Sequence, residues 1–190
     1  MRWEGLFEDL AGQWLAEERR ERDAEVADRT RAERAKVLLV ERYAASVGTT
    51  LTLTVRTGEV LTGRLLDLGS DWLLLQDATG HDVLVAVGAV VAVSGLSERS
   101  ESATTARRFA IGYALRGLSR DRATVVVADV SGARVSGTID GVGRDWCDVA
   151  EHPVDEPRRP GQVRARRTVP VESLVWIRHA VPSVEEDRGL

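Results

Sequence analysis

Five arginines gather between residues 158 and 167, and their guanidinium groups are the side chains of this sequence best suited to hold phosphate. Arginine binds phosphate oxygens through paired hydrogen bonds, so such a cluster predicts contact with RNA or DNA. The surrounding segment, residues 151–168, also contains Glu151, Asp155 and Glu156 and two prolines, Pro157 and Pro160, and no aromatic side chain is interleaved between the arginines to stack on a base. Two interpretations stay open, phosphate contacts or a solvated loop, for Arg158, Arg159, Arg164, Arg166 and Arg167.

The dipeptide Asp-Trp occurs twice, as Asp71-Trp72 and Asp145-Trp146. An exposed tryptophan would stack on a base or on a side chain of a partner. Alternatively, the tryptophan fills the interior of its module and the aspartate caps the preceding glycine turn. Recurrence at one position of a repeat favours the second interpretation.

Cys147, His152 and His179 are the only arrangement that suggests a metal or a cysteine–histidine catalytic pair. Zinc sites have closer ligand pairs and a fourth ligand. Cys147 also lies between Trp146 and Asp148 in an expected strand, where a thiol is commonly buried. We therefore predict no metal, no cofactor and no catalytic residues, hence a protein that is not an enzyme. One cysteine also excludes an intrachain disulfide.

Apolar residues near the N-terminus recur at the spacing of one helix face. This stripe predicts either a docking helix for a partner's groove or packing against the chain's own core. The charged stretch that follows contains pairs such as Glu18 and Arg22, four residues apart in the favourable order. The stripe consists of Trp3, Leu6, Phe7, Leu10 and Trp14.

The chain matches itself at an offset of 74 residues, which indicates two copies of one β-rich module. Gly63 and Gly137 correspond, each inside a long expected strand, where a glycine predicts a bend or bulge. The repeat signature is Gly63, Asp71, Trp72 and, in the second copy, Gly137, Asp145, Trp146.

Hydrophobic periodicity then divides the chain. Residues 1–36 are predicted to form a helical arm, amphipathic and then charged, and 97–103 a linker rich in Ser and Glu. Residues 37–96 and 104–180 each begin with a helix and continue with five short strands, and 181–190 form a tail. Gly48 is placed to end the first module's helix.

A helix followed by five bent antiparallel strands resembles the Sm-like fold. The matching stretches are LTLTVRTGEVLTGRLLDLGSDWLLLQDA with VLVAVGAVVAV, and TVVVADVSGARVSGTIDGVGRDWCDVA with VPVESLVWI. The resemblance implies an α+β, mainly β fold: the helical arm followed by two Sm-like or SH3-type five-stranded small barrels in tandem. Sm-like modules usually pair the fourth strand of one with the fifth of a neighbour, so we expect the two modules of this chain to pair in this way or to pack directly.

Two departures limit what the Sm-like resemblance implies. Trp72 and Trp146 stand where RNA-binding Sm proteins place asparagine, and the arginine of their Arg-Gly pair is missing in both copies. Uridine binding is therefore not implied. The chain also resembles actinobacterial proteins, some labelled Fis-type regulators. That label suggests a helix-turn-helix at RRFAIGYALRGLSRDRA, but strand-like residues follow it directly.

Composition is typical of a soluble globular protein, and the net charge of −4 gives no global bias toward nucleic acid. No signal peptide or membrane-spanning run is expected, so we predict a cytoplasmic protein without membrane association. The sequence predicts a non-enzymatic binding or adaptor protein in a protein assembly, either a monomer or a small oligomer. The alternative is an RNA-binding protein that uses the arginine-rich loop in RNA metabolism.

Overall fold

The computed structural model describes residues 3–101, 108–154 and 163–180. The chain divides into two compact units, Met1–Leu39 and Val40–Leu190. In the first unit, α1 (Trp3–Arg34) is one helix whose charged part carries ion pairs three or four residues apart. The pair expected between Glu18 and Arg22 forms at 2.6 Å. Such exposed pairs each stabilise a helix by about 0.2–0.5 kcal/mol.

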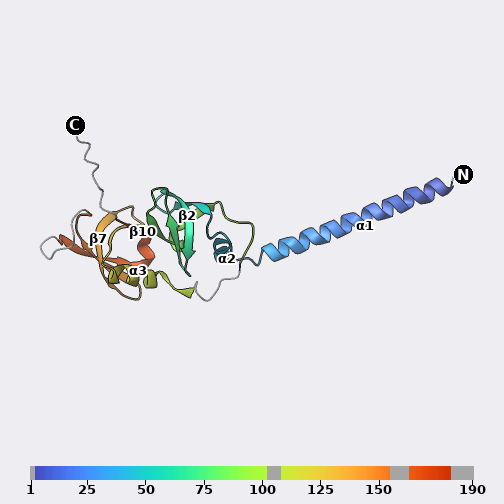
Figure 1. Cartoon of the computed structure of the whole chain (residues 1–190). Coiled ribbons are helices and arrows are strands. Elements are labelled where there is room, and N and C mark those ends of the chain that lie inside the picture. Colours follow the sequence, from blue (N-terminus) through green and yellow to red (C-terminus); the bar gives the residue numbers. More distant parts are fainter. Residues whose placement is uncertain (1–2, 102–107, 155–162, 181–190) are drawn as a thin grey trace, which may run out of the picture. The chain divides into compact units, whose positions relative to one another are not determined.

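After the arm, the described residues form two short α-helices, two 3-10 helices and ten strands. Figure 1 labels both α-helices and several of the strands. The α-helices are α2 (Leu39–Ala44) and α3 (Ile111–Arg120). Alternating apolar and polar residues produce the strands, as the sequence predicts. The strands of the first half are β1 (Thr50–Val55), β2 (Val60–Leu68), β3 (Trp72–Gln76), β4 (Asp82–Ala86) and β5 (Val90–Ser94). Those of the second half are β6 (Thr124–Asp129), β7 (Arg134–Val142), β8 (Trp146–Glu151), β9 (Ala165–Pro170) and β10 (Leu174–His179).

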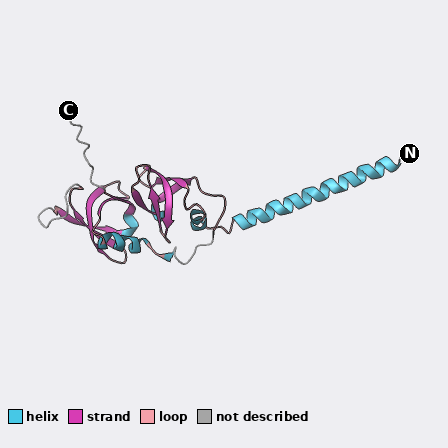
Figure 2. Ribbon diagram, viewed as in Figure 1, coloured by secondary structure: helices cyan, strands magenta, loops and turns pink. Residues whose placement is uncertain are grey.

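The expectation of two separate five-stranded barrels is wrong. All ten strands belong to one antiparallel sheet, in the order β5-β1-β2-β3-β4-β10-β6-β7-β8-β9, which is open within the described residues. Figure 2 shows these strands in magenta. The two halves join where β10 pairs with β4, with Trp176 opposite Val85 and Arg178 opposite Val83. An edge strand exposes unpaired backbone N–H and C=O groups, and at this junction the groups of β4 and β10 hydrogen-bond to each other. The expected pairing between the fourth strand of one half and the last strand of the other is confirmed.

Gly63 and Gly137 are required by close approach of a neighbouring strand. A Cβ on Gly63 would lie 2.6 Å from the carbonyl oxygen of Gln76, and one on Gly137 would lie 2.0 Å from that of Ala150. The expected bulges exist but lie further along β2 and β7, where the register shifts between Leu65 and Asp67 and between Ile139 and Gly141. The glycines therefore permit strand contact, and the bends lie beyond them.

One hydrophobic core runs through both halves of the sheet. It contains Leu53 and Leu73 from the first half and Val127 and Ile177 from the second. Helix α3 covers the second half, where it lies against β7 and buries Ile111 and Leu115, four residues apart on one face (Figure 1). The chain then enters β6 directly, as expected, so no second helix follows α3.

Candidate binding surfaces

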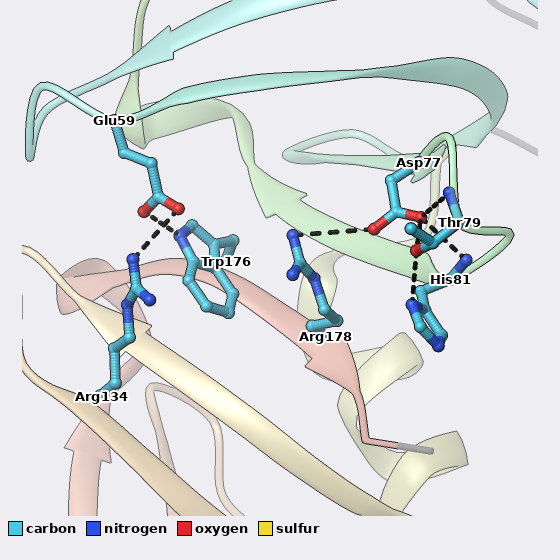
Figure 3. Close-up of polar contacts among 7 residues, drawn as sticks. All are labelled: Glu59, Asp77, Thr79, His81, Arg134, Trp176 and Arg178. Carbon is cyan, nitrogen blue, oxygen red and sulfur yellow. Dashed lines mark hydrogen bonds and ion pairs between the residues drawn. The ribbon is translucent and has the colours of Figure 1, made fainter. Parts of the chain in front are cut away.

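The junction of the two halves is lined by a polar cluster around Trp176 (Figure 3). The indole N–H of buried Trp176 donates to Glu59 Oε2 at 2.9 Å, and Arg134 donates to Glu59 Oε1 at 3.2 Å. The guanidinium carbons of Arg134 and Arg178 lie 5.3 and 5.5 Å from the Trp176 ring centre, within the range of a cation–π contact. The cluster thus ties the β1–β2 turn to β7 and β10.

Asp77 and its neighbours form the other end of this cluster (Figure 3). Asp77 lies 3.7 Å from Arg178, and its carboxylate accepts from the Thr79 hydroxyl at 2.5 Å. Because that hydroxyl has one proton, it accepts from His81 Nδ1, 2.7 Å away. Partial burial raises the pKa of Asp77, but hydrogen bonds from Thr79 and His81 and the charge of Arg178 outweigh it, so the pKa lies below its usual value.

Two hollows border the cluster, of about 280 and 330 Å³. Asp77 and Arg178 line the first, Arg134 and Gly132 the second, and Glu59 lines both. Their charged groups are paired with one another across the junction. The geometry therefore describes a clamp between the two halves, and we assign it no acid–base chemistry.

The two ends of the sheet differ sharply in chemistry. Strand β5 pairs only with β1 among the described strands and reads Val-Val-Ala-Val-Ser, without charge or proline. Val91 is exposed on it. At the opposite end, β9 carries Arg166, Arg167 and a terminal Pro170. Charges and proline are the usual means of protecting an edge from further pairing, so β9 is protected and β5 is not.

Trp72 is buried, as the interior interpretation predicts, but the hydrogen bond of Asp71 differs from the expected one. Trp72 Nε1 and the backbone N–H of Ser70 both donate to the carbonyl oxygen of Phe109, at 3.0 and 3.1 Å. Asp71 Oδ1 accepts from the backbone N–H of Ile111 at 2.6 Å. Asp71 therefore caps the start of α3, not the glycine turn that precedes it. We call residues 69–72 the first corner.

Residues 143–146 form the matching second corner. The same backbone bonds are present: Gly143 N donates to Trp146 O at 2.8 Å, as Gly69 N does to Trp72 O at 2.9 Å. Trp146, however, is exposed, as are Arg144 and Asp145. The interior interpretation thus describes Trp72, whereas Trp146 has the exposure that a surface contact needs.

The structure describes three of the five arginines of the basic segment, and Arg158 and Arg159 lie outside the described residues. Arg167 pairs with Glu151 at 2.8 Å and Arg166 with Asp140 at 3.4 Å. Arg164 is exposed beside the start of β9. Two guanidinium groups are thus already offset by carboxylates of β7 and β8, which lowers the attraction of this surface for phosphate.

The stripe of the N-terminal arm lies on α1, from Trp3 to Trp14. Only the Trp14 side chain of the stripe is described, and it is exposed. The side chains of Trp3, Leu6, Phe7 and Leu10 lie outside what the structure describes. The prediction that this stripe docks on a partner stays a prediction.

Cys147 and His152 are both buried, and hydrogen bonds account for the histidine. His152 Nδ1 lies 2.8 Å from the carbonyl oxygen of Pro153 and must donate to it, so Nε2 accepts from the Thr138 hydroxyl at 2.7 Å. Burial, and then the charge of Asp148, raise the pKa of Cys147 to about 11. Among the described residues, no group of three His, Cys, Asp or Glu is placed to hold a metal.

Sequence reasoning missed the junction cluster of Glu59, Arg134, Trp176 and Arg178. The only sequence signal was that a tryptophan in an apolar strand needs an acceptor for its indole N–H. Nothing local indicates that this acceptor is Glu59, which precedes it by 117 residues.

No family model and no curated protein matches this sequence. Within the described residues, no helix has the length and apolar character needed to cross a bilayer.

Proposed function

We propose that this chain is a non-enzymatic binding protein, an adaptor in a protein assembly, and that its principal contact surface is the edge of strand β5. The observation that carries the proposal is the chemistry of that edge. Among the described strands, β5 pairs on one side only, with β1; its residues carry no charge, and the Val91 side chain is exposed. An extended segment of a partner adds to such an edge by main-chain hydrogen bonds, and side chains such as Val91 contribute apolar contact.

As a surface for binding a partner, the edge of β5 has better support than the arginine-rich segment. Arg166 and Arg167 are engaged with acidic side chains. No aromatic residue lies between the arginines as a stacking platform. RNA binding remains the alternative hypothesis, and with it the assignment of Arg158, Arg159 and Arg164 to phosphate contacts. We also propose a cytoplasmic location, which fits the single, buried cysteine.

A charge placed on the edge tests the proposal. Val91→Lys puts an ammonium group on an exposed position of β5, where lysine blocks strand addition without disturbing the core. The matched control is Val26→Lys, a comparably exposed valine on α1. Tagged parent and variants are expressed in cells, and captured proteins are quantified by mass spectrometry. We expect Val91→Lys to lose the partners that the parent and Val26→Lys retain. Equal capture by all three chains would exclude the β5 edge.

The RNA alternative has its own measurement, a salt titration against mixed single-stranded RNA. Phosphate contacts would give a log–log slope of about −0.7 per contact, with little dependence on base sequence. Replacing Arg158, Arg159, Arg164, Arg166 and Arg167 by Ser would then abolish binding. Tight binding by the parent that is lost in this variant would favour RNA over the adaptor role.

A further inference from the structure

The first corner holds the start of a helix through three hydrogen bonds. The carbonyl oxygen of Phe109 accepts from Trp72 Nε1 at 3.0 Å and from the backbone N–H of Ser70 at 3.1 Å. Two residues further on, the N–H of Ile111 donates to Asp71 Oδ1 at 2.6 Å. Ile111 is the first residue of α3, and the first N–H groups of a helix have no acceptor within it. The first corner therefore recognises a carbonyl group and an N–H group two residues apart.

A glycine in each corner keeps a place open beside the indole nitrogen. A Cβ on Gly69 would lie 2.0 Å from Trp72 Nε1 and 2.3 Å from the carbonyl oxygen of Phe109. A Cβ on Gly143 would lie 2.3 Å from Trp146 Nε1. Both indole nitrogens thus occupy the place where a side chain would begin. In the first corner the bound carbonyl shares that place, and in the second corner Gly143 leaves it clear of a side chain.

The backbone frame of the second corner also matches that of the first. The N–H of Val171 donates to the carbonyl oxygen of Asp145 at 2.8 Å. The equivalent bond of the first corner, from Val87 to Asp71, is 2.8 Å as well. The aspartate and the tryptophan of each corner are therefore held by equivalent hydrogen bonds, so the second corner is already formed without a bound segment.

The second corner has no described occupant. Trp146 is 40% exposed, whereas Trp72, which the segment before α3 covers, is 8% exposed. Within the described residues, Trp146 Nε1, the backbone N–H of Arg144 and the carboxylate of Asp145 have no hydrogen-bond partner. Two donors and one acceptor, equivalent to those that hold residues 109–111 in the first corner, are thus open to solvent.

We propose that the second corner binds the start of a helix of a partner protein, as the first corner binds residues 109–111. The indole N–H of Trp146 and the backbone N–H of Arg144 donate to one carbonyl oxygen of the partner. Two residues further along the partner, a backbone N–H donates to the carboxylate of Asp145, which also opposes the positive end of the helix dipole. That partner residue is aliphatic, like the buried Ile111, and packs against the exposed indole.

This site would give the protein a second contact surface. An adaptor that holds two partners at once needs two separate surfaces, and the edge of β5 and the second corner belong to different halves of the repeat. The inference goes beyond the proposed function and does not depend on the β5 edge, so either proposal can fail alone.

The probe for the second corner is a synthetic peptide of residues 108–121, RFAIGYALRGLSRD, which reproduces the segment that the first corner binds. Its ends are acetylated and amidated, because terminal charges would act on the helix dipole. The full chain is labelled with ¹⁵N, and the indole N–H signals of Trp146 and Trp72 are assigned from the Trp146→Phe and Trp72→Phe variants. We expect the peptide to shift the Trp146 signal and to leave the Trp72 signal unchanged, because α3 already fills the first corner.

A proline in the peptide tests the hydrogen bond to Asp145 without changing the protein. Proline is favoured as the first residue of a helix, and Ala110 has φ of −75° and ψ of 162°, which suits a residue before proline. Ile111→Pro therefore preserves the helix start and removes only the donating N–H. Fluorescence anisotropy of the labelled peptides should show binding about tenfold weaker for the proline peptide.

Variants of the protein test the other side of the contact by the same anisotropy measurement. Trp146→Phe keeps an aromatic ring but has no N–H, so we expect binding about tenfold weaker. Asp145→Asn keeps an acceptor oxygen but loses the charge, and a smaller weakening is expected. Trp14→Phe, at an exposed tryptophan of α1, is the matched control, and Val91→Lys controls for the β5 edge. Both controls should bind the peptide as the parent does.

Several results would overturn the inference. They are no shift of the Trp146 signal at about 1 mM peptide, a shift of Trp72 in its place, or equal binding of the parent and proline peptides. A Trp146 signal that responds to mixed single-stranded RNA and not to the peptide would also overturn it, since the indole would then be a surface for base stacking. In each case the β5 edge is judged by the capture experiment alone. Peptide binding that persists after a failed capture experiment would leave the second corner as the contact surface.

Discussion

Trp176 and Glu59 are joined by a 2.9 Å hydrogen bond across the junction of the sheet, although they belong to different halves of the chain. The indole is buried, and Glu59 is the acceptor for its N–H. The same carboxylate pairs with Arg134, so one side chain of the β1–β2 turn serves two residues of the second half. This contact adds side-chain bonding to the β4–β10 ladder and helps to hold the ten strands as one sheet.

Removing Glu59 should weaken the junction measurably. Glu59→Ala leaves the Trp176 N–H buried without an acceptor and Arg134 without its carboxylate. An unpaired buried donor costs about 1–3 kcal/mol. We expect the free energy of unfolding, from urea denaturation followed by tryptophan fluorescence, to fall by that amount. Glu172→Ala, at an exposed acid, is the control and should leave it unchanged. Equal effects of the two variants would show that the junction does not depend on Glu59.

Gly137→Ala should destabilise the second half. The new Cβ would lie 2.0 Å from the Ala150 carbonyl oxygen, so β7 and β8 must separate. Such overpacking costs about 1–3 kcal/mol. Gly88→Ala is the control, because a Cβ there meets nothing within 4 Å and the backbone is not left-handed. Thermal unfolding of both variants provides the measurement, and a Gly137 variant as stable as Gly88→Ala would contradict the close approach of the strands.

Acid should destabilise the fold partly through Asp129. A hydrogen bond from the Ser131 hydroxyl, and then backbone N–H bonds, hold the pKa of Asp129 below its usual value of 3.8. A carboxyl with a lowered folded pKa gives stability that is complete above the unfolded pKa and is lost as pH falls through the folded pKa. Urea midpoints measured from about pH 6 to pH 2 should therefore fall with acid.

The Asn variant isolates that contribution. Asp129→Asn cannot titrate, so its midpoint should depend less on pH than that of the parent in the same acidic window. Asp77→Asn should behave alike, since the pKa of Asp77 is also lowered. Parallel curves for parent and variants would mean that these carboxyls titrate alike in the folded and unfolded chains.

Cys147 should be inert while the protein is folded. Its pKa of about 11 keeps the thiol protonated near neutral pH, and the thiolate is the reactive form. A thiol-specific chromogenic reagent at about pH 8 should label the native chain slowly and the urea-unfolded chain at once. Rapid labelling of native protein would show that β8 opens readily or that Cys147 is not buried there.

The individual strands could be predicted from sequence because the information is local. Leu51, Leu53 and Val55 alternate with polar residues, and that period of two produces β1 wherever one face of a sheet is buried. Gly48 has the left-handed φ of +86° that the sequence suggested, but α2 ends at Ala44, so Gly48 closes the turns that follow the helix and does not cap the helix itself. The arm, the strands and the direct passage from α3 into β6 were predictable for the same reason.

The joining of the strands was decided by tertiary structure. Backbone hydrogen bonds of a ladder are alike for every strand, so the pairing of β4 with β10 was expected only from the Sm-like resemblance, and the residue pattern alone did not require that it merge two modules into one open sheet. Trp72 and Trp146 make the point most clearly, since both follow the same Gly-x-Asp pattern. One is buried because the segment before α3 covers it, and the other is exposed because no described segment does. Residue type and local spacing determined the two corners, whereas burial of each indole depended on which distant segment reached it.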